Sequence, residues 1–495
     1  MGGVNRKEKL RRIVKDKIND RQLLVLSYRE PYTHYYEAGE IKHRKNTGGL
    51  VAALDPVMKA CGGTWIACGE TEADREAVDK EDKVCVPFDG DDYDLRRIWL
   101  SKEERNAFIR GVSNRALWPL MHFVYVRPYF DEEQWKVYRK MNKRFAEAAI
   151  QEAKEKNAFI WIQDYHLALC AKYIKDEMPD AVVAQFWHIP WPSSEIFRIF
   201  PWHRELTEGL LANDLLGFHI RYYSNNFMDS VDRSVEARVE RENSSIFYND
   251  HETKVREFPI SVDDKTIEKM SKETTHNDID ILKKEYGIGD EKIIASISRM
   301  DYTKGISEQF MAYDKFLENN PKYLKKVVLV QVISPSRTEI PEYQDLEEKA
   351  SHLAFELNWK YGDGRWRPIV LINEFIDQKV LVAIYKMAEV FIVNSLQDGM
   401  NIVCKEYAAA KQDGDGTLIL SKFTGASREL DSAILVNPFS ENEVSEAFKK
   451  ALEMPKKERR KRLKRMREVV RENDVYNWAG KFIEKLGRIE AQVSK

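Results

Sequence analysis

The stretch that decides the fold reads Lys292-Ile-Ile-Ala-Ser-Ile-Ser298, followed directly by Arg299-Met-Asp-Tyr-Thr-Lys304-Gly305. The first part is a short apolar run, which predicts a buried strand. Two cations and a glycine follow it, and the sequence from Ile306 onward suits a helix. Ligands bind beyond the carboxyl ends of the strands in open α/β sheets. The pattern therefore predicts an α/β domain with a cationic ligand site at this strand end.

The two cations of this stretch, Arg299 and Lys304, suit a diphosphate that carries about two negative charges. A solvated surface pair is the alternative. A second stretch, Asp398-Gly-Met-Asn-Ile-Val-Cys-Lys-Glu406, favours the ligand site. It predicts a turn that leads into a helix, whose first N–H groups can bind a phosphate or a sugar hydroxyl. Glu406, expected about two turns into that helix, suits a ribose diol, and the stretches together predict a nucleotide-sugar site.

Length and composition limit the class of protein. The 495 residues suit two domains of roughly 200–250 residues each. With 43% apolar and 32% charged residues and a net charge of -2, we expect a soluble protein without nucleic-acid partners. The absence of a signal peptide and of long apolar stretches predicts a cytoplasmic protein that binds no membrane. The five cysteines show no metal-ligand spacing, which favours free thiols.

Strand-like runs alternate with helical segments along the chain, which predicts parallel βαβ units. The pattern restarts near residue 263, so we expect one domain over residues 1–262 and a second over 263–474, with a last helix over 475–495. The predicted buried strands are 23–27, 159–162, 181–186, 214–219, 292–298, 326–333, 368–372, 390–393, 417–420 and 433–436.

Two connecting segments of the first domain carry specific expectations. The residues after Arg29 read as a loop rich in tyrosine and charge that closes on Thr47-Gly48-Gly49. Two glycines that open a helix let backbone N–H groups approach an anion, although a plain turn is the alternative. The segment Asn114-Arg-Ala-Leu-Trp-Pro119 is expected to leave a helix for a loop.

Polar side chains follow the predicted strands of the first domain where a parallel sheet places its ligands. They are Arg29, Asp164 and His188. Asp164 with His166 could form a metal pair, but no third ligand has suitable spacing, so we expect no metal. His188 could also be a core histidine, whereas Arg29 directly after a buried strand is hard to explain as core. Trp65 and Trp118 could simply pack.

These motifs together resemble the trehalose-6-phosphate synthase family, retaining glycosyltransferases of family 20 with the two-domain GT-B fold. The resemblance runs from about residue 22 to 485. The motifs, in chain order, are Gly48-Gly49-Leu50, Asn114 to Pro119, Asp164-Tyr-His166, His188-Ile-Pro190, Asp214-Leu-Leu-Gly-Phe218, Arg299 to Gly305, Asp398-Gly-Met-Asn401 and Lys405-Glu406-Tyr407. The opening, Tyr28-Arg-Glu-Pro-Tyr32, also resembles glucosylglycerol-phosphate synthases.

The resemblance implies two Rossmann-like, doubly wound domains that face a central cleft, with the last helix crossing back to the first domain. Residues 1–262 would bind the acceptor and 263–474 the nucleotide sugar. The donor, a nucleoside-diphosphate glucose, would be held by Gly49, Arg299, Lys304, Asp398, Gly399, Met400, Asn401, Ile402, Val403 and Glu406. The phosphorylated acceptor would be held by Arg29, Trp65, Trp118, Asp164 and Arg337.

The chemistry that the resemblance implies is electrostatic. The departing diphosphate takes the proton of the acceptor hydroxyl on the same face of the sugar, and protein groups stabilise the developing charges. The implied catalytic residues are Arg299, Lys304, Asp398, His188 and Asp164. No metal or other cofactor is expected, because two side-chain cations stand in for one.

The chain departs from the family at two positions. Synthases that use glucose 6-phosphate usually carry a tyrosine where this chain has Ile109, beside Phe108, and an arginine where it has Gln397. We expect transfer of glucose to glucose 6-phosphate, giving α,α-trehalose 6-phosphate. The alternatives are glycerol 3-phosphate or another phosphorylated acceptor, and a catalytically weak protein that senses sugar phosphates. The base of the donor (UDP, GDP or ADP), any regulation and a homo-oligomeric state are left open.

Overall fold

The computed structural model describes residues 6–18, 21–46, 48–87, 90, 92–156 and 158–493. The chain divides into two compact units. Unit 1 consists of two segments of the chain, one that ends at Ile260 and one that begins at Val475. Unit 2 is Ser261–Asp474. The assignment of acceptor to the first domain and of donor to the second stays a prediction. Residues 1–5, 19 and 20 of the predicted N-terminal segment, Thr47, and 494–495 of the last helix lie outside the described residues.

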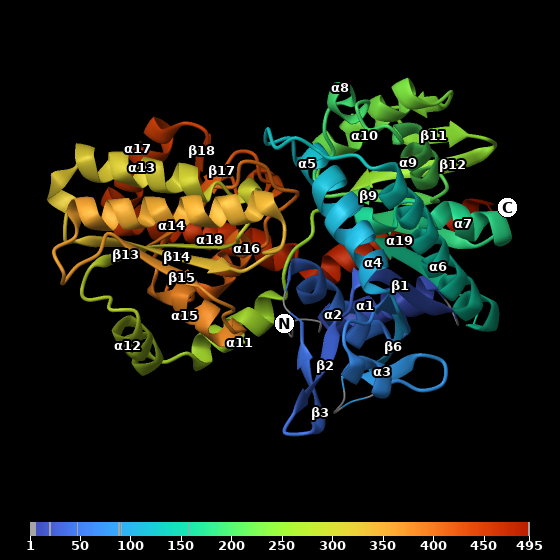
Figure 1. Cartoon of the computed structure of the whole chain (residues 1–495), viewed down its shortest axis with the longest axis horizontal. Helices are drawn as coiled ribbons and strands as arrows, with labels where there is room; N and C mark the ends of the chain where they lie inside the picture. Colours follow the sequence, from blue (N-terminus) through green and yellow to red (C-terminus); the bar gives the residue numbers. More distant parts are fainter. Residues whose placement is uncertain are drawn as a thin grey trace. The chain divides into compact units, whose positions relative to one another are not determined.

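Unit 2 is a parallel sheet with helices on both faces (Figure 1). Its strand order is β15-β14-β13-β16-β17-β18, and every pairing is parallel. Its elements are α11 Asp264–Glu273, α12 His276–Glu285, β13 Lys292–Arg299, η3 Tyr302–Lys304, α13 Ile306–Asn319, η4 Pro321–Tyr323, β14 Val327–Ser334, α14 Pro341–Tyr361, β15 Ile369–Asn373, α15 Gln378–Met387, β16 Val390–Val393, α16 Val403–Ala410, β17 Thr417–Ser421, η5 Gly425–Arg428, β18 Ile434–Val436, α17 Glu441–Glu453 and α18 Lys456–Glu472.

The sequence explains why this sheet is buried on both faces. The strands are runs of valine, isoleucine and leucine rather than alternating patterns, which is typical of parallel sheets covered by helices. Helices α13, α14 and α17 pack together, as do α11, α15 and α16. One hydrophobic core combines helix and strand residues, among them Phe310, Phe316, Phe448, Ile294 and Leu329.

The order of the strands in unit 2 reverses between β13 and β16, which are neighbours in the sheet although two strands separate them in the chain. Such a reversal leaves a crevice at the carboxyl ends of the two strands, where ligands bind in open α/β sheets. The stretch after β13 carries Arg299 and Lys304, and the stretch after β16 carries Asp398. The two segments singled out from the sequence therefore meet at this point.

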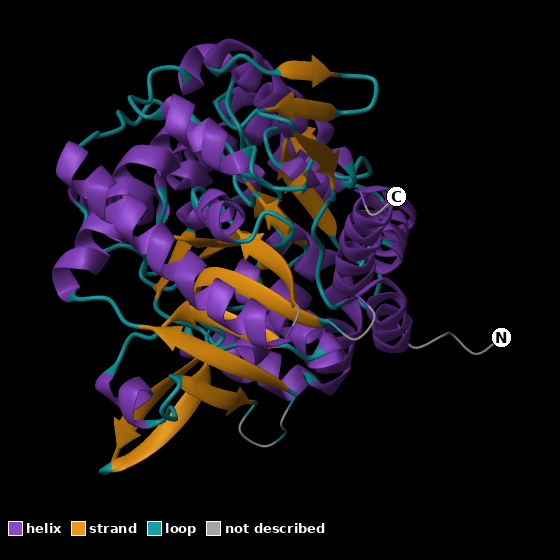
Figure 2. Cartoon of the chain, turned by 90° about the vertical axis from the view of Figure 1, so that its right-hand side faces the viewer, coloured by secondary structure: helices purple, strands orange, loops and turns teal. Residues whose placement is uncertain are grey.

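Unit 1 has a larger, mixed sheet, whose strands are visible with their flanking helices in Figure 2. The strand order is β10-β11-β12-β9-β8-β7-β1-β4-β6-β5. Its elements are α1 Arg6–Ile18, β1 Gln22–Arg29, β2 Tyr32–Glu37, β3 Glu40–Lys45, α2 Gly49–Cys61, β4 Thr64–Cys68, α3 Glu72–Glu76, β5 Lys83–Val86, β6 Tyr93–Ile98, α4 Lys102–Arg105, η1 Asn106–Leu117, α5 Trp118–His122, α6 Glu132–Lys156, β7 Ala158–Gln163, η2 Tyr165–Leu167, α7 Cys170–Glu177, β8 Val182–Phe186, α8 Ser194–Phe197, α9 His203–Leu210, β9 Leu215–Phe218, α10 Arg221–Ser234, β10 Arg238–Glu240, β11 Ser245–Tyr248, β12 His251–Glu257 and α19 Val475–Val493.

The central strands of this sheet, from β12 to β6, are parallel, and their order reverses between β1 and β7. Arg29 is the last residue of β1, and Asp164 directly follows β7. Both polar groups predicted to follow these strands therefore lie at the second reversal point. Six strands of this sheet were not predicted, namely β4, β5, β6, β10, β11 and β12. Antiparallel pairing extends the sheet at both edges, where β5 pairs with β6, and β11 pairs with both β10 and β12.

Two local expectations for unit 1 are wrong. The residues after Arg29 form an antiparallel hairpin, β2 with β3, rather than a loop. The tyrosines and β-branched residues of this segment favour a strand. Because β3 is exposed along its whole length, its charged residues do not show the alternation of apolar and polar positions that would predict a strand. The chain also does not leave the helix at Pro119: η1, a π-helix, continues into α5 up to His122. Pro119 is the second residue of α5, directly after the π-helix.

The last helix, α19, belongs to unit 1 and packs against α1 and α2. Phe482 stacks on Trp161 of β7 with ring centroids 4.7 Å apart, and Trp478 lies 5.2 Å from the same ring. The last helix thus completes the hydrophobic core of unit 1, which the N-terminal part of the chain forms. Among the described residues, no helix is long and apolar enough to cross a membrane.

Candidate functional site

The candidate site in unit 2 starts at the end of β13. Arg299 is the last residue of the strand, and its side chain is 36% exposed. The chain then turns through η3, and Gly305 adopts a left-handed conformation (φ 64°) that lets α13 begin at Ile306. A side chain at Gly305 would collide with the carbonyl oxygen of Asn394, 2.3 Å from an added Cβ. The glycine is thus required for the loops after β13 and β16 to lie this close.

The loop after β16 meets the first loop through Lys304. Its Nζ lies 2.6 Å from Oδ2 of Asp398, and both side chains are mostly buried. Asn401 and Ser395 also donate to this carboxylate oxygen, from 3.1 Å and 3.3 Å. Two of the predicted donor-site residues are therefore paired with each other. A charged ligand that binds here would either compete with Asp398 for Lys304 or bind the Asp398 carboxylate that Lys304 orients.

Asp301 is the buried anion that organises the cations of this site. Its Oδ1 accepts hydrogen bonds from the backbone N–H and the hydroxyl of Thr303, and its Oδ2 lies 3.3 Å from Arg337 and 3.7 Å from Arg299. Although burial opposes its charge, the cations Arg337, Arg299 and Lys304 lower the pKa of Asp301 to about 2. Asp301 is therefore ionised at neutral pH and holds both arginines.

The turn after Asp398 is fixed by its own backbone contacts. Asp398 N–H donates to the Phe423 carbonyl (3.1 Å), and Ala426 N–H donates to the Met400 carbonyl (2.9 Å). Gly425 allows this approach, since an added Cβ would lie 2.2 Å from the Gly399 oxygen. Met400 is buried, whereas Asn401, Ile402 and Val403 are partly exposed where α16 begins. The structure therefore supports a ligand contact by the exposed backbone at the start of α16 more than a contact by the buried Met400 side chain.

Glu406 lies in the first turn of α16, not two turns into it, because the helix begins only at Val403. Its Oε2 accepts a hydrogen bond from the hydroxyl of Tyr385, 2.7 Å away. Burial raises the pKa of Glu406, and the Tyr385 hydrogen bond opposes this shift. Burial, followed by the charge of Glu406, raises the pKa of Tyr385 far above its ordinary value, so the phenol stays protonated and donates.

Arg337 lies after β14 and has a strained backbone conformation for a residue with a side chain (φ 55°). It donates to Asp301 and to the hydroxyl of Tyr343, and its guanidinium lies 5.2 Å from the Tyr343 ring centroid. Its predicted acceptor role stays a prediction. The geometry places it with Arg299 around one carboxylate of unit 2.

In unit 1, Arg29 and the glycine pair lie side by side. An added Cβ on Gly48 would lie 4.0 Å from Nη1 of Arg29. Gly48 has φ 133° and ψ 152°, a conformation that only glycine adopts readily, and Gly49 starts α2. The hairpin carries this turn: Asn46 donates from Nδ2 to the Glu30 carbonyl (3.0 Å) and to the hydroxyl of Thr33 (2.8 Å).

Asp164 and His188 form a second contact in unit 1. Asp164 follows β7 with φ 67°, and its Oδ1 accepts a hydrogen bond from the backbone N–H of His188, 3.2 Å away. Burial, with His219 and His166 nearby, holds the pKa of His188 well below its ordinary value, so the ring is neutral. Nε2 of His188 lies 2.9 Å from the side-chain amide of Gln163, which holds the orientation of the ring.

The two predicted acceptor-site tryptophans are core residues in this structure. Trp65 has no exposed surface, and its indole N–H donates to the hydroxyl of Ser27 at 2.8 Å. Trp118 is 6% exposed and lies 4.0 Å from the His122 ring centroid. This burial gives no support to a ligand contact by Trp65. Ile109 lies partly buried on η1, beside Phe108, whose ring meets the Tyr28 ring edge-on at 6.0 Å.

Sequence reasoning missed two residues of unit 2. Asp301 stands inside the decisive stretch between two cations, so the signal was present in the sequence. Tyr385 lies 21 residues before Glu406, on a different helix, and no pattern connects the two. Only the packing of α15 against α16 brings its hydroxyl to the carboxylate.

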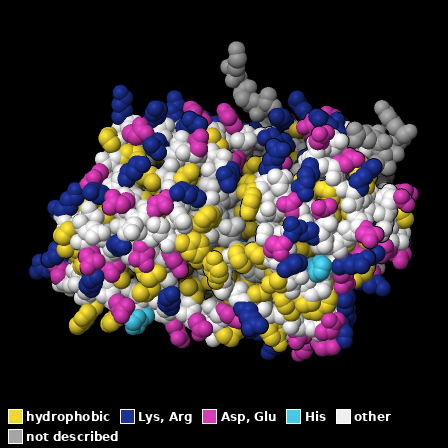
Figure 3. Space-filling model, turned by 90° about the horizontal axis from the view of Figure 1, so that it is seen from above, with side chains coloured by type: hydrophobic (Ala, Val, Ile, Leu, Met, Phe, Trp, Pro, Cys, Tyr) yellow, Lys and Arg dark blue, Asp and Glu magenta, His cyan; other side chains and the backbone are white. Residues whose placement is uncertain are grey.

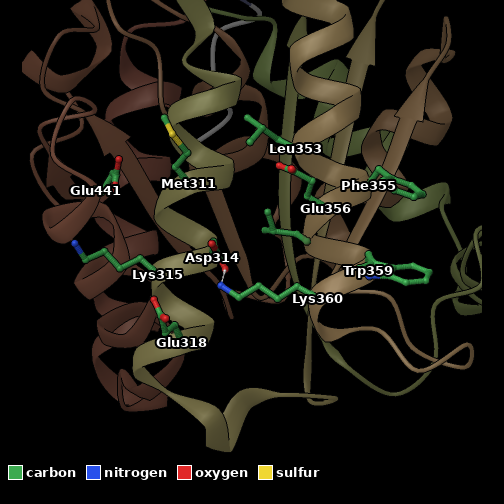
Figure 4. Close-up of a pocket in the computed structure, with 11 residues that line it drawn as sticks. Met311, Asp314, Lys315, Glu318, Leu353, Phe355, Glu356, Trp359, Lys360 and Glu441 are labelled. Atoms are coloured by element: carbon green, nitrogen blue, oxygen red, sulfur yellow. Dashed lines mark hydrogen bonds and ion pairs between the residues drawn. The ribbon is translucent and has the colours of Figure 1, made fainter.

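The remaining surface features indicate no further ligand class. Among the described residues, no group of three or more His, Cys, Asp or Glu side chains could hold a metal ion. Basic and acidic side chains are mixed over the face seen in Figure 3. A shallow pocket between α13 and α14 is lined by no predicted site residue, and its Phe355 and Trp359 are 65% and 82% exposed (Figure 4).

Comparison with known proteins identifies similar chains. The model of glycosyltransferase family 20 matches residues 21–488. The UDP-forming α,α-trehalose-phosphate synthase of Pichia angusta is 34% identical over 454 residues, 90% of this chain and 93% of that protein. A solved structure from E. coli with bound UDP-2-fluoro glucose is 30% identical (TM-score 0.84, covering 94% of this chain and 99% of that one).

A third similar chain is the UDP-forming α,α-trehalose-phosphate synthase of Burkholderia xenovorans, solved in complex with glucose-6-phosphate. It is 28% identical, with a TM-score of 0.85, and the match covers 94% of this chain and 99% of that one. The predicted α/β fold of GT-B type is confirmed by these likenesses.

Proposed function

This chain belongs to glycosyltransferase family 20, and we propose that it transfers glucose from UDP-glucose to glucose 6-phosphate, giving α,α-trehalose 6-phosphate with retention of configuration. The observation that carries the proposal is the meeting of Arg299, Lys304 and Asp398 at the strand-order reversal of unit 2. Two cations there match the charge of a diphosphate, and the similar E. coli chain binds a UDP-sugar analogue.

The donor site would work by electrostatic preorganisation. When the bond between the glucose C1 and the diphosphate oxygen breaks, negative charge develops on UDP, and we assign Arg299 and Lys304 to stabilise it. Asp301 keeps Arg299 and Arg337 in position without moving when the charge appears, since it is buried and fixed by Thr303. Preorganised charges cost no rearrangement during the reaction, which is why they lower its barrier.

The acceptor step needs no enzyme carboxylate as nucleophile. The acceptor hydroxyl forms the new bond to C1 on the face that UDP leaves, and its proton passes to the departing diphosphate oxygen. Arg29, at the reversal point of unit 1, and Arg337, in unit 2, are the cations we assign to the acceptor phosphate. Neutral His188 and Asp164 are assigned to hydroxyl groups of the sugars.

The identity of the acceptor is the sharpest question, since Ile109 stands where a tyrosine is usual. The similar Burkholderia xenovorans chain binds glucose 6-phosphate, which supports the same acceptor here. A phosphate pocket with one hydroxyl donor fewer would bind its ligand more weakly by about 1–3 kcal/mol, which lowers affinity without removing the activity. We therefore expect a raised KM for glucose 6-phosphate rather than a different product.

The test measures product by mass spectrometry from UDP-, GDP- and ADP-glucose, each with glucose 6-phosphate and with glycerol 3-phosphate. A disaccharide phosphate from UDP-glucose and glucose 6-phosphate is the expected result. Product with glycerol 3-phosphate alone would overturn the acceptor, and product with another nucleotide alone would overturn the donor. Binding of UDP-glucose without any product would favour a sensor of sugar phosphates.

A further inference from the structure

A buried tyrosine lies beneath the carboxylate that we assign to the donor ribose. Tyr385, near the end of α15, is 2% exposed, and its hydroxyl donates to Oε2 of Glu406 across 2.7 Å. Glu406 itself is partly exposed. The tyrosine bond uses one lone pair of Oε2, so both carboxylate oxygens can still accept hydrogen bonds from a ligand.

The ring of Tyr385 has little freedom to move. It meets the ring of Phe391 in β16 edge-on, with centroids 5.4 Å apart, and lies 6.5 Å from the ring of Tyr407 in α16. Phe391 and Tyr407 stack on each other at 4.7 Å with an interplanar angle of 13°. Since a strand and a helix fix these rings, the hydroxyl of Tyr385 has a fixed position relative to α16.

We propose that Tyr385 is a positioning residue that orients the Glu406 carboxylate for a bidentate hydrogen bond with the 2′- and 3′-hydroxyls of the donor ribose. The inference rests on the proposed function, because it takes a nucleoside-diphosphate sugar as the ligand of unit 2. Tyr385 itself touches no substrate. Its effect reaches the ribose only through Glu406.

The physical reason is the flexibility of glutamate. A free glutamate side chain rotates about three bonds, and a bidentate hydrogen bond to a diol requires one orientation of the carboxylate plane. A hydrogen bond to a charged group, already present before the ligand arrives, removes most of this freedom in advance. Without it, the binding of each ribose has to order the carboxylate.

The variant that tests the proposal is Tyr385→Phe, which keeps the packed ring and removes only the hydroxyl. We expect KM for UDP-glucose to rise about tenfold, the effect of removing one hydrogen bond to a charged group. The kcat at saturating donor and KM for glucose 6-phosphate should stay within about twofold, because the reacting atoms and the acceptor are not involved.

A donor without the ribose hydroxyls separates positioning from a general loosening of the fold. With 2′,3′-dideoxy-UDP-glucose the wild type cannot form the hydrogen bonds to Glu406, so Tyr385→Phe should have no additional effect on KM. A purely structural role of the tyrosine would weaken both donors equally. The same comparison can be made without catalysis, by calorimetric binding of UDP and of 2′,3′-dideoxy-UDP.

Tyr313→Phe is the matched control. Tyr313 is fully buried in α13 of the same unit, and its hydroxyl has no hydrogen-bond partner among the described residues. Its removal should leave all the kinetic constants unchanged. The proposal is overturned if Tyr385→Phe binds UDP as the wild type does, or if its affinity falls equally for UDP and its dideoxy analogue. Absence of product with intact discrimination between the two nucleotides would instead refute the proposed function alone.

Discussion

The expected role of Arg299 in binding the diphosphate follows from its position at the end of β13. It ends a largely buried strand, and the anion Asp301, 3.7 Å away, holds it at the strand-order reversal of unit 2. We expect Arg299→Ala to lower kcat/KM by about 10²–10³-fold, because the leaving diphosphate then loses one of its two preorganised cations. Steady-state kinetics with UDP-glucose and glucose 6-phosphate measure the effect. Lys292→Ala, at the exposed opposite end of the same strand, is the control, and equal losses of activity in both variants would contradict the assignment.

A second residue, Glu30, predicts how stability depends on pH. It is buried beside Arg97, whose Nε lies 2.9 Å from its Oε2, and Arg97 also pairs with the buried Asp74 at 2.8 Å. Burial raises the pKa of Glu30 to about 8, although Arg97 opposes this shift. The folded protein therefore holds a proton there that the unfolded chain releases near its ordinary pKa of about 4.3.

The sign of the effect follows from proton linkage. Between about pH 5 and pH 8 the folded state binds one proton more than the unfolded state at Glu30, so rising pH favours unfolding by at most about 1.4 kcal/mol per unit. Stability from this group is complete below the unfolded pKa and is lost as the pH rises through the folded pKa. In Glu30→Gln, urea unfolding should show a flatter pH dependence than the wild type over this window. Glu40→Gln, on the exposed strand β3, should behave as the wild type, and an equal slope in all three proteins would refute the prediction.

At the scale of the element, the sequence predicts ten of the strands, because each of these is a short apolar run with polar residues at its end, but it misses the buried strand β4. All ten predicted strands are present, with ends that agree or differ by at most two residues. The hairpin β2–β3 escaped prediction because it lies outside the main sheet and buries only part of β2. Tertiary contacts, such as the Asn46 bonds at its base, hold it rather than a local pattern.

The candidate site was predictable to a similar degree. Arg299, Lys304 and Asp398 follow strands in the sequence, so the rule for strand ends finds them. The burial of Trp65 could not be read from the sequence, because a tryptophan in an apolar strand suits a core and a binding site equally. The early position of Glu406 in α16 depends on where the turn at Asn401 lets the helix begin, which the residue types do not fix.

The turn at the end of the hairpin supports a prediction of its own. Gly48 has φ 133° and ψ 152°, where any side chain is strained, and it lies beside Arg29 and directly before Gly49. Gly48→Ala should lower the free energy of unfolding by about 1–3 kcal/mol and, because it shifts the start of α2, raise the substrate KM values several-fold. Denaturant titration and steady-state kinetics measure the two effects.

Gly39 in the turn between β2 and β3 provides the comparison. It also has positive φ (84°), and an added Cβ would meet nothing within 4 Å. Gly39→Ala should destabilise the protein by a similar amount and leave both KM values unchanged. If the two alanine variants have the same kinetics, the Gly48-Gly49 turn has no special part in ligand binding.

For the whole molecule, the important fact is that the chain leaves unit 1 at Ile260, forms unit 2, and returns at Val475. Each unit has its own doubly wound sheet, and in each some of the predicted ligand-binding side chains lie at the reversal of strand order: Arg29 and Asp164 in unit 1, and Arg299, Lys304 and Asp398 in unit 2. Both units thus place polar side chains at strand ends in the same way. Unit 1 differs because its core is incomplete until the last helix, α19, has been made.

The dependence of unit 1 on α19 can be measured at Phe482. Its ring stacks on Trp161 and fills the space above Gly217, where an added Cβ would lie only 2.7 Å from Cε2 of Phe482. Phe482→Ala opens a cavity between α19 and the sheet and should lower the free energy of unfolding by about 3–5 kcal/mol. All of the 11 tryptophans except Trp359 and Trp366 lie in unit 1, so tryptophan fluorescence reports its unfolding. Tyr222→Ala, at a 56% exposed site of α10, should shift the midpoint little, and a wild-type midpoint for Phe482→Ala would mean that α19 does not complete the core.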